Sequence, residues 1–210
     1  MRLTCEITRD PELLGQYYRI REASFRRDLG LPDFDGSEDE RDRSSHILVA
    51  RYGGRCIGGT RISGRHPGQT LPLPMEEQGL DLHASFPQLR LWENAYCQWS
   101  RYVVDPEFRT TAVLRQFSNA GIDASRALGY VCNFVVAGMA RARLYKRLYS
   151  ILGYRCEILP GIRIPPEPGF QGLPHLLSVA FLDPDFEELF WTRPDTPAFG
   201  YCLAMPGATA

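Results

Sequence analysis

Two arginines of this chain lie inside segments whose other residues are typical of apolar strands. Arg61 ends the run Gly58-Gly59-Thr60-Arg61, and Arg101 lies in Trp99-Ser100-Arg101-Tyr102. A buried charge is costly unless it is paired, so each guanidinium must contact a carboxylate. That carboxylate belongs either to the protein or to a substrate, and the sequence leaves both alternatives open.

The N-terminal segment adds one more arginine and two carboxylates. Arg21 falls on a helical pattern, and Asp39 and Asp42 follow in the polar, acidic stretch 33–45. An arginine fork binds a carboxylate, and an ammonium needs an acidic partner, so these side chains could clamp a zwitterionic acceptor. The plainer interpretation is a surface ion pair that ties the loop to the helix and contributes only about 0–1 kcal/mol.

Several short elements must position these residues. Apolar residues recur at three- and four-residue intervals from Pro11 until Gly30 and Pro32, which predicts a first helix. Two strand-like runs flank Gly53-Gly54, which predicts a tight hairpin. The remaining predicted elements are a strand at 3–8, a long Gly- and Pro-rich excursion at 64–90, strands at 92–105, 130–138, 155–164 and 175–183, and helices at 107–129 and 140–153.

Length and composition indicate one globular domain. The chain has 210 residues, 44% hydrophobic and 23% charged, and the element order predicts an α/β (α+β) fold with helices packed on a mixed sheet. We expect a core over about 3–182 and a C-terminal extension over 183–210.

The charge pattern excludes several function classes. A net charge of −1 gives no positive field for nucleic acid, and no apolar run approaches the ~20 residues that span a bilayer. Charged residues interrupt the N-terminus before a signal-peptide core could form. We therefore expect a soluble, cytoplasmic protein with no nucleic-acid partner and no integral membrane association.

The metal-binding side chains are scattered. No C-x-x-C pair occurs, and neither the cysteines nor the histidines fall at the spacings of a zinc site. We therefore predict no metal site and no disulfide framework. The residues in question are Cys5, Cys56, Cys97, Cys132, Cys156, Cys202, His46, His66, His83 and His175.

The run Val103-Val104-Asp105-Pro106-Glu107-Phe108-Arg109 ends a strand just before a helix, where free backbone N–H groups and the positive helix end can meet a ligand. Together with Tyr149-Ser150-Ile151-Leu152-Gly153-Tyr154 downstream, this run resembles the core of the GNAT superfamily of N-acyltransferases. The resemblance implies a mostly antiparallel sheet with a V-shaped strand split that binds an acyl thioester. It also implies that Tyr149 protonates the departing thiolate and that Val103, Val104, Arg109, Thr110 and Thr111 bind the donor.

The segment after Arg109 departs from that pattern. Members that use acetyl-CoA have glycines there to wrap a pyrophosphate, whereas Arg109-Thr110-Thr111-Ala112-Val113-Leu114 has none. We therefore expect an acyl carrier protein thioester as the donor rather than acyl-CoA. Because carrier proteins are acidic, Arg109 and Arg115 are predicted to dock this partner.

The N-terminal half resembles one branch of that superfamily. Its motifs occur in the order found in acyl-homoserine-lactone (autoinducer) synthases and long-chain N-acyl amino acid synthases, over about residues 15–155. The resemblance implies an acceptor that is either S-adenosylmethionine or an ordinary amino acid, and no metal or redox cofactor. The implied acceptor-binding residues are Arg21, Phe25, Asp39, Asp42, Arg61 and Arg101, and His46 fits a strand start of the amino acid branch.

Two departures concern the chemistry of this branch. Leu31 stands where autoinducer synthases have tryptophan, and Gln98 stands where they have glutamate. Glu93, five residues upstream on the same predicted strand, is then the expected base, acting directly or through a water held by Glu93 or Gln98. The alternatives are a small-molecule N-acetyltransferase that uses acetyl-CoA, and a non-catalytic acyl-binding module, which Gln98 would favour.

Overall fold

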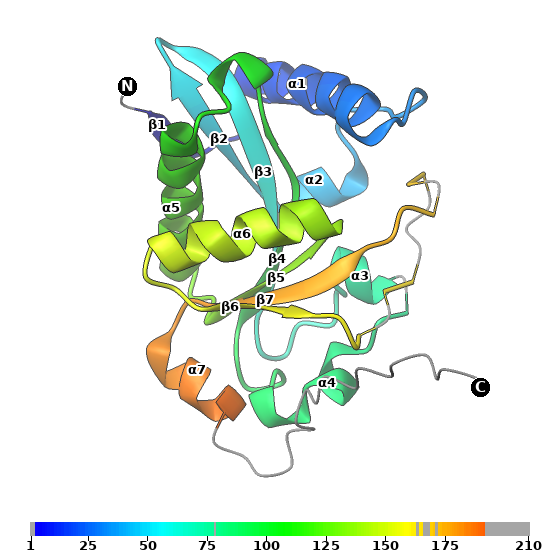
Figure 1. Cartoon of the computed structure of the whole chain (residues 1–210), viewed down its shortest axis with the longest axis vertical. Coiled ribbons are helices and arrows are strands. Elements are labelled where there is room, and N and C mark those ends of the chain that lie inside the picture. The colour runs from blue at the N-terminus through cyan, green and yellow to red at the C-terminus, as the bar shows by residue number, and fades with distance from the viewer. Residues whose placement is uncertain (1–2, 78, 163, 166–168, 171, 192–210) are drawn as a thin grey trace, which may run out of the picture.

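The periodic segment that begins at Pro11 forms the long helix α1 (Pro11–Leu29). Asp10 caps its first turn by accepting hydrogen bonds from the backbone N–H groups of Glu12 and Leu13, and Gly30 ends it with φ +65°. The computed structural model describes residues 3–77, 79–162, 164–165, 169–170 and 172–191 (Figure 1). Within them β1 (Thr4–Ile7) precedes α1, and the short helix α2 (Glu40–Ser44) follows it.

The predicted hairpin is present. It consists of β2 (His46–Tyr52) and β3 (Arg55–Arg65), and its turn residues Gly53 and Gly54 both have positive φ, as a two-residue turn of this type requires. At Gly59 a Cβ atom would lie 2.5 Å from the ring of Tyr17, so the missing side chain lets α1 pack closely on β3.

The described residues form a seven-stranded sheet with the order β1-β2-β3-β4-β5-β7-β6. Strand β4 (Tyr96–Val104) is parallel to β5 (Cys132–Ala137), whereas every other neighbouring pair is antiparallel. Strand β7 (Leu176–Phe181) lies between β5 and β6 (Cys156–Leu159). The predicted mixed, mostly antiparallel sheet is confirmed.

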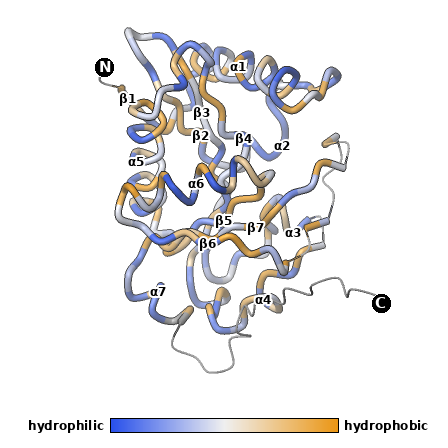
Figure 2. The backbone as a smooth tube through the Cα atoms, viewed as in Figure 1, coloured by the Kyte–Doolittle hydropathy of each residue, from blue (hydrophilic) through white to orange (hydrophobic). Residues whose placement is uncertain are grey.

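Helices cover both faces of this sheet (Figure 1). One face packs against α5 (Thr111–Ala127) and α6 (Met139–Ile151), with Phe117 and Leu148 in a shared core. The other face packs against α1 near β2 and β3, and against the connection between β3 and β4, which contains the predicted excursion, near β5 and β7. Figure 2 shows hydrophobic residues concentrated along the strands. Along α1 and α6, hydrophobic residues alternate with hydrophilic ones.

Two segments contain helices that the sequence patterns do not predict. The excursion holds α3 (Pro74–Glu77), α4 (Leu82–Ser85) and the 3₁₀ turn η1 (Pro87–Leu89). Helix α7 (Pro184–Trp191) falls in the predicted C-terminal extension, yet Phe186 and Phe190 are buried in the core beneath β7. The globular core therefore continues past residue 182.

The parallel pair β4–β5 separates partway along its length. Register pairing runs from Tyr96–Cys132 to Trp99–Val135 and stops there, although β4 continues to Val104. On its other edge β4 has an irregular register opposite Gly59–Arg61, and Arg101 there has φ +57°. This irregularity is a β-bulge, which bends a strand, and the diverging strands form the predicted V-shaped split.

The described residues contain no helix long and apolar enough to cross a membrane. Within the same part of the chain, no group of His, Cys, Asp and Glu side chains has the arrangement of a metal site. Five cysteines are free thiols, and Cys202 lies outside the described residues.

Candidate active site

Two cavities open at the divergence of β4 and β5. The first, here called the α5-side cavity, measures about 110 Å³ and is lined by Tyr102, Val103, Val104, Arg109, Leu114, Arg141, Leu144 and Tyr145. The second, the α1-side cavity, measures about 80 Å³. Its lining comes from α1, β4, β5, α6 and the segment before β7, and consists of Phe25, Leu29, Gln98, Trp99, Ser100, Arg101, Tyr102, Val135, Val136, Ala137, Gly138, Arg141, Tyr145, Phe170 and His175.

Among the described residues, three side chains line both cavities and so mark where they adjoin. They are Tyr102 on β4 and Arg141 and Tyr145 on α6. The Tyr102 hydroxyl pairs with Ser118 on α5 at 3.4 Å. Burial raises the pKa of Tyr145 above its ordinary value of 10.0, while the positive charge of Arg141 lowers it. Tyr145 therefore keeps its proton at neutral pH.

Tyr149 does not line either of these cavities. Its side chain is 1% exposed, and its hydroxyl accepts a hydrogen bond from Asn133 Nδ2 at 2.7 Å. Asn133 Oδ1 in turn accepts the backbone N–H of Trp99 at 2.9 Å. Trp99 is the last residue of β4 that pairs with β5. Burial raises the pKa of Tyr149 well above its ordinary value. The structure places Tyr149 in a bracing network behind the split, while Tyr145, one helical turn earlier, faces the split.

Arg21 and Asp42 form a buried ion pair between α1 and α2. Arg21 Nη1 and Nη2 donate to Asp42 Oδ1 and Oδ2 at 3.0 and 2.9 Å, and the two residues are 1% and 0% exposed. Arg21 also donates to the carbonyls of Gly36 and Ser37. The Arg21 guanidinium is therefore paired within the protein, as the plainer of the two sequence interpretations proposed. That interpretation placed the ion pair on the surface, whereas the structure buries it.

Arg61 joins the same network from β3. Its Nη1 lies 2.8 and 2.9 Å from the two carboxylate oxygens of Asp39 and 3.3 Å from Asp42 Oδ1. Its Nε donates to the Ser100 hydroxyl at 3.0 Å. Because the Asp39 side chain is 41% exposed, this carboxylate forms the solvent end of a charge network whose other members are buried.

Asp39 and Asp42 also shape α2 itself. Each side chain accepts the backbone N–H of the other, at 2.8 and 3.0 Å, which is a capping box for this one-turn helix. Burial opposes ionisation of Asp39, but the Arg61 charge and the Asp42 N–H outweigh it, and the pKa of Asp39 lies below its ordinary value of 3.8.

Arg101 lies among aromatic side chains. Its guanidinium carbon lies 5.8 Å from the ring centroid of Phe25, 5.5 Å from that of Phe34 and 4.9 Å from that of Phe170, which is cation–π distance. The Arg101 carbonyl accepts the Tyr17 hydroxyl at 3.0 Å. Arg101 and Phe25 are thus the two predicted acceptor residues that line the α1-side cavity.

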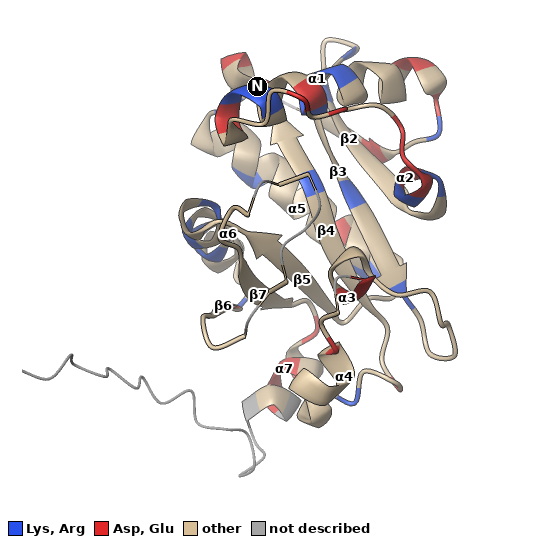
Figure 3. Ribbon diagram, turned by 90° about the vertical axis from the view of Figure 1, so that its right-hand side faces the viewer, with Lys and Arg blue, Asp and Glu red and all other residues tan. Residues whose placement is uncertain are grey.

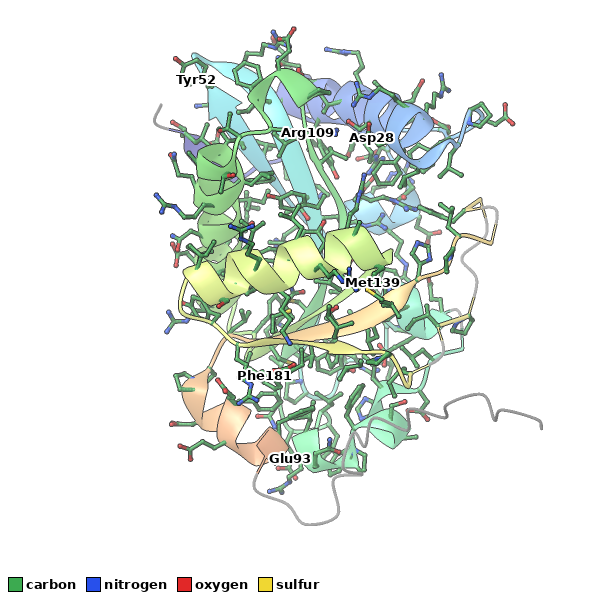
Figure 4. The ribbon with its side chains drawn as sticks, in the orientation of Figure 1. Asp28, Tyr52, Glu93, Arg109, Met139 and Phe181 are labelled. Atoms are coloured by element: carbon green, nitrogen blue, oxygen red, sulfur yellow. The ribbon has the colours of Figure 1, made fainter. Side chains whose placement is uncertain are left out.

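The two predicted base positions differ in location. Gln98 is buried and lines the α1-side cavity, and its Oε1 accepts the Met75 backbone N–H at 3.0 Å, which holds α3 against β4. The placement of Glu93 on this strand is wrong, because β4 begins at Tyr96. Glu93 lies in the turn after η1, is ion-paired with Arg90, and sits at the opposite end of the molecule from Arg109 (Figure 4).

The residues predicted to bind the donor also lie in different places. Val103, Val104 and Arg109 line the α5-side cavity, and Arg109 pairs with Asp28 on α1 at 2.6 Å (Figure 4). Thr110 caps α5 by accepting the Val113 N–H, and Thr111 is exposed in its first turn. Arg115 lines a separate hollow between β1 and α5.

Sequence reasoning missed four residues that line the split: Arg141, Tyr145, Phe170 and His175. Tyr145 and Arg141 lie on the same predicted helix as Tyr149, so a helical projection against β5 could have singled them out. Phe170 and His175 belong to a Pro- and Gly-rich connection that carries no periodic signal.

No family model matches the chain, and no curated protein matches it. Solved structures do. FeeM, an N-acyl amino acid synthase from uncultured soil microbes, is 12% identical with a TM-score of 0.58 over 90% of this chain and 94% of its own. BjaI, a CoA-dependent acyl-homoserine lactone synthase with SAM and isopentyl-CoA, is 18% identical with a TM-score of 0.56 over 86% and 81%.

A mutant agmatine N-acetyltransferase in its apo form is 16% identical with a TM-score of 0.55, over 86% of this chain and 99% of its own. Likeness at such low identity establishes the fold. The chain therefore has the GNAT-like fold that N-acyl amino acid synthases, acyl-homoserine lactone synthases and N-acetyltransferases share.

Proposed function

We propose that this protein is an N-acyltransferase acting at the β4–β5 split. It transfers an acyl group from an acyl carrier protein thioester to the amine of an amino acid-like acceptor. The product is an N-acyl amino acid or an N-acyl-homoserine lactone signal. One observation carries the proposal: β4 and β5 separate after Trp99 and Val135, and cavities adjoin on the two sides of that separation.

The α5-side cavity suits the thiol arm of the donor. Val103, Val104, Leu114 and Leu144 give it apolar walls, and Arg109 and Arg141 lie in its lining. A pantetheine arm has amide groups that can pair with the strand edge left open beyond Trp99. In this proposal the thioester carbonyl reaches the apex, where backbone N–H groups of the diverging strands stabilise the oxyanion.

The outer surface of α6 supports a carrier protein as the donor. This helix contains no acidic residue and exposes Arg143, Lys146 and Arg147. Leu144, which is also exposed on the helix, lines the α5-side cavity. Figure 3 shows α6 as a basic segment without acidic interruption. An acidic partner would be steered to this surface and would present its thioester at the cavity mouth.

The α1-side cavity suits the acceptor. Arg101 lines it within an aromatic surround, and a carboxylate that displaced part of that surround would meet a guanidinium fork. In this proposal the acceptor does not contact Arg21, Asp42 or Arg61. Their buried network instead holds α1, α2 and β3 together. Asp39, at the exposed end, is the member available to an ammonium.

The chemistry needs no metal or redox cofactor, because a thioester is already activated for attack by an amine. The free amine forms the N–C bond while the carbonyl electron pair moves to oxygen. Collapse of the intermediate breaks the C–S bond and leaves the electron pair on sulfur. Tyr145 supplies the proton to that thiolate and regains one from the new amide nitrogen.

A small-molecule N-acetyltransferase that uses acetyl-CoA is the second candidate, favoured by the small volume of the α1-side cavity, about 80 Å³. CoA carries a pyrophosphate that must contact backbone N–H groups near the start of α5. There the Thr110 hydroxyl already accepts the Val113 N–H, and the segment 109–114 contains no glycine. These features favour carrier-bound pantetheine.

Mass spectrometry of lipid extracts tests the proposal. Cells that overexpress the wild-type protein should accumulate an N-acylated amine, and cells that express Leu144→Trp should accumulate less, because the larger ring narrows the cavity mouth. Ile151→Trp is the matched control, since Ile151 is a similarly exposed apolar residue on the same helix, outside both cavities. Extracts without any new N-acylated product would contradict the function.

A further inference from the structure

Acyl transfer to an amine requires a base, and the side chains expected to act as one do not supply it. The acceptor enters as an ammonium and must lose a proton before it attacks. Gln98 is an amide, and its Oε1 already accepts the Met75 N–H. Glu93 lies at the far end of the molecule, paired with Arg90 (Figure 4).

The titratable side chains that line the α1-side cavity can be compared one by one. Among the described residues these are Arg101, Tyr102, Arg141, Tyr145 and His175. The two guanidinium groups stay protonated at all relevant pH values. Burial raises the pKa of Tyr102 and of Tyr145, so both phenols hold their protons. His175 is left as the group that can accept a proton near pH 7.

The sheet register places His175 at the open end of the split. Strand β7 begins with Leu176, which pairs with Ala137 at the end of β5. The pairing of β5 with β4 has already ended two residues earlier, at Val135. The residue just before β7 is therefore fixed beside the part of β5 that has lost its β4 neighbour.

An aromatic side chain connects the imidazole with Arg101. The ring of Phe170 lies edge-on to it, with centroids 5.8 Å apart, and Phe170 is itself packed against the Arg101 guanidinium. The described charged groups in this cavity, Arg101 from β4 and Arg141 from α6, are both positive. The imidazole therefore lies in the same cavity as the guanidinium that is proposed to bind the acceptor carboxylate.

We propose that His175 is the general base of the reaction, in place of the glutamate that Gln98 replaces. This inference rests on the proposed acyltransferase function. A ring nitrogen of neutral His175 takes one proton from the acceptor ammonium, and the nitrogen keeps its electron pair as a free amine. After the amide has formed, the imidazolium releases that proton to solvent. No other co-reactant is needed.

The experiment measures steady-state transfer by wild type, His175→Gln and His175→Ala, with imidazole added to the alanine variant. Loss of a general base lowers kcat by about 10²-fold or more with little change in the acceptor KM. Imidazole should restore turnover of His175→Ala in proportion to its concentration, and the wild-type rise of kcat with pH should be absent from His175→Gln. His66→Gln is the matched control, because His66 packs on Tyr130 away from the split.

The outcomes separate the two claims. A wild-type protein that transfers no acyl group to any amine overturns the proposed function, and with it the base. A wild type that transfers, together with His175→Gln at a kcat within threefold of it, overturns the base alone. A loss of kcat that imidazole does not restore and that leaves the pH profile unchanged also overturns the base. If His175→Ala unfolds, the profile of His175→Gln decides.

Discussion

The Tyr149 hydroxyl and the Asn133 side-chain amide form a 2.7 Å hydrogen bond behind the apex of the β4–β5 split. Asn133 also holds the backbone N–H of Trp99, and the Trp99 indole donates to Ser125 on α5. One asparagine therefore links α6, β5 and the last paired residue of β4. This link gives the motif tyrosine a structural task. Two other phenols, Tyr102 and Tyr145, line both cavities, and because the Tyr102 hydroxyl pairs with Ser118, Tyr145 is the proposed proton donor.

Tyr145→Phe and Tyr149→Phe should have opposite signatures. Removing the Tyr145 hydroxyl should lower kcat about 10²-fold with little change in stability, because it takes away a proton donor. Removing the Tyr149 hydroxyl leaves Asn133 Nδ2 buried without an acceptor and should cost about 1–3 kcal/mol of unfolding free energy. Urea unfolding and steady-state kinetics check both variants, with Tyr154→Phe as the control, since Tyr154 is half-buried and lines neither cavity. A larger kcat loss in Tyr149→Phe would restore the motif assignment.

Asp42→Asn and Arg101→Lys should separate folding from acceptor binding. Asp42 is fully buried between Arg21 and Arg61, so its neutralisation leaves buried positive charge and should cost about 3–5 kcal/mol of unfolding free energy. Arg101→Lys keeps the charge but loses the planar fork, and should raise the acceptor KM without changing the donor KM. The measurement varies each substrate in turn. A shift in donor KM alone would place the acceptor elsewhere.

Stability should fall in acid partly through Asp39. Its folded-state pKa lies below the ordinary value of 3.8, because the Arg61 charge outweighs burial. The stabilisation is therefore fully present above that ordinary value and is lost as the pH falls through the lower folded-state pKa. The unfolding free energies of wild type and Asp39→Asn should differ at pH 7, and the difference should shrink progressively as the pH falls below about 4. Asparagine still caps α2, so a difference that persists in acid would assign the effect to the cap.

Charge reversal on α6 tests the carrier protein. Arg143→Glu and Arg147→Glu should each lower kcat/KM with acyl carrier protein about tenfold at low salt, and added salt should lower the wild-type value in the same direction. Acyl-pantetheine, which has no acidic domain, should react equally with all variants. Arg126→Glu, on α5, is the control. Equal or better kcat/KM with acyl-CoA at low salt would contradict the carrier-protein donor.

The elements of the fold follow from local signals, whereas their pairing does not. Proline, glycine and helical spacing predicted α1, the Gly53-Gly54 hairpin and the helices after β4 and β5 within a few residues. The placement of β7 between β5 and β6 depends on contacts distant in sequence, and no local pattern encodes it. Phe186 and Phe190 fall in the predicted extension, although Asp183 followed by Pro184 is a helix-start signal. The Asp183 side chain accepts the backbone N–H groups of Asp185 and Phe186.

The candidate site shows the same division. Several site residues that the motifs predicted do line the two cavities, namely Phe25, Gln98, Arg101, Val103, Val104 and Arg109. Motif order could not show that Arg21 and Asp42 neutralise each other, because partner choice in a buried network depends on three-dimensional approach. It misplaced Glu93 because the aromatic, β-branched run extended the predicted strand to residue 92, whereas the chain turns at 91–94 before β4.

The most direct measurement is acyl transfer by the purified protein. Acyl carrier proteins loaded with a series of acyl chains are incubated with amino acids or S-adenosylmethionine, and products are identified by mass spectrometry. The account predicts an N-acyl product whose rate of formation falls about 10²-fold in Tyr145→Phe and is unchanged in Tyr154→Phe. Absence of an N-acyl product from every carrier and CoA thioester, with the wild-type protein folded, would contradict acyl transfer at the β4–β5 split.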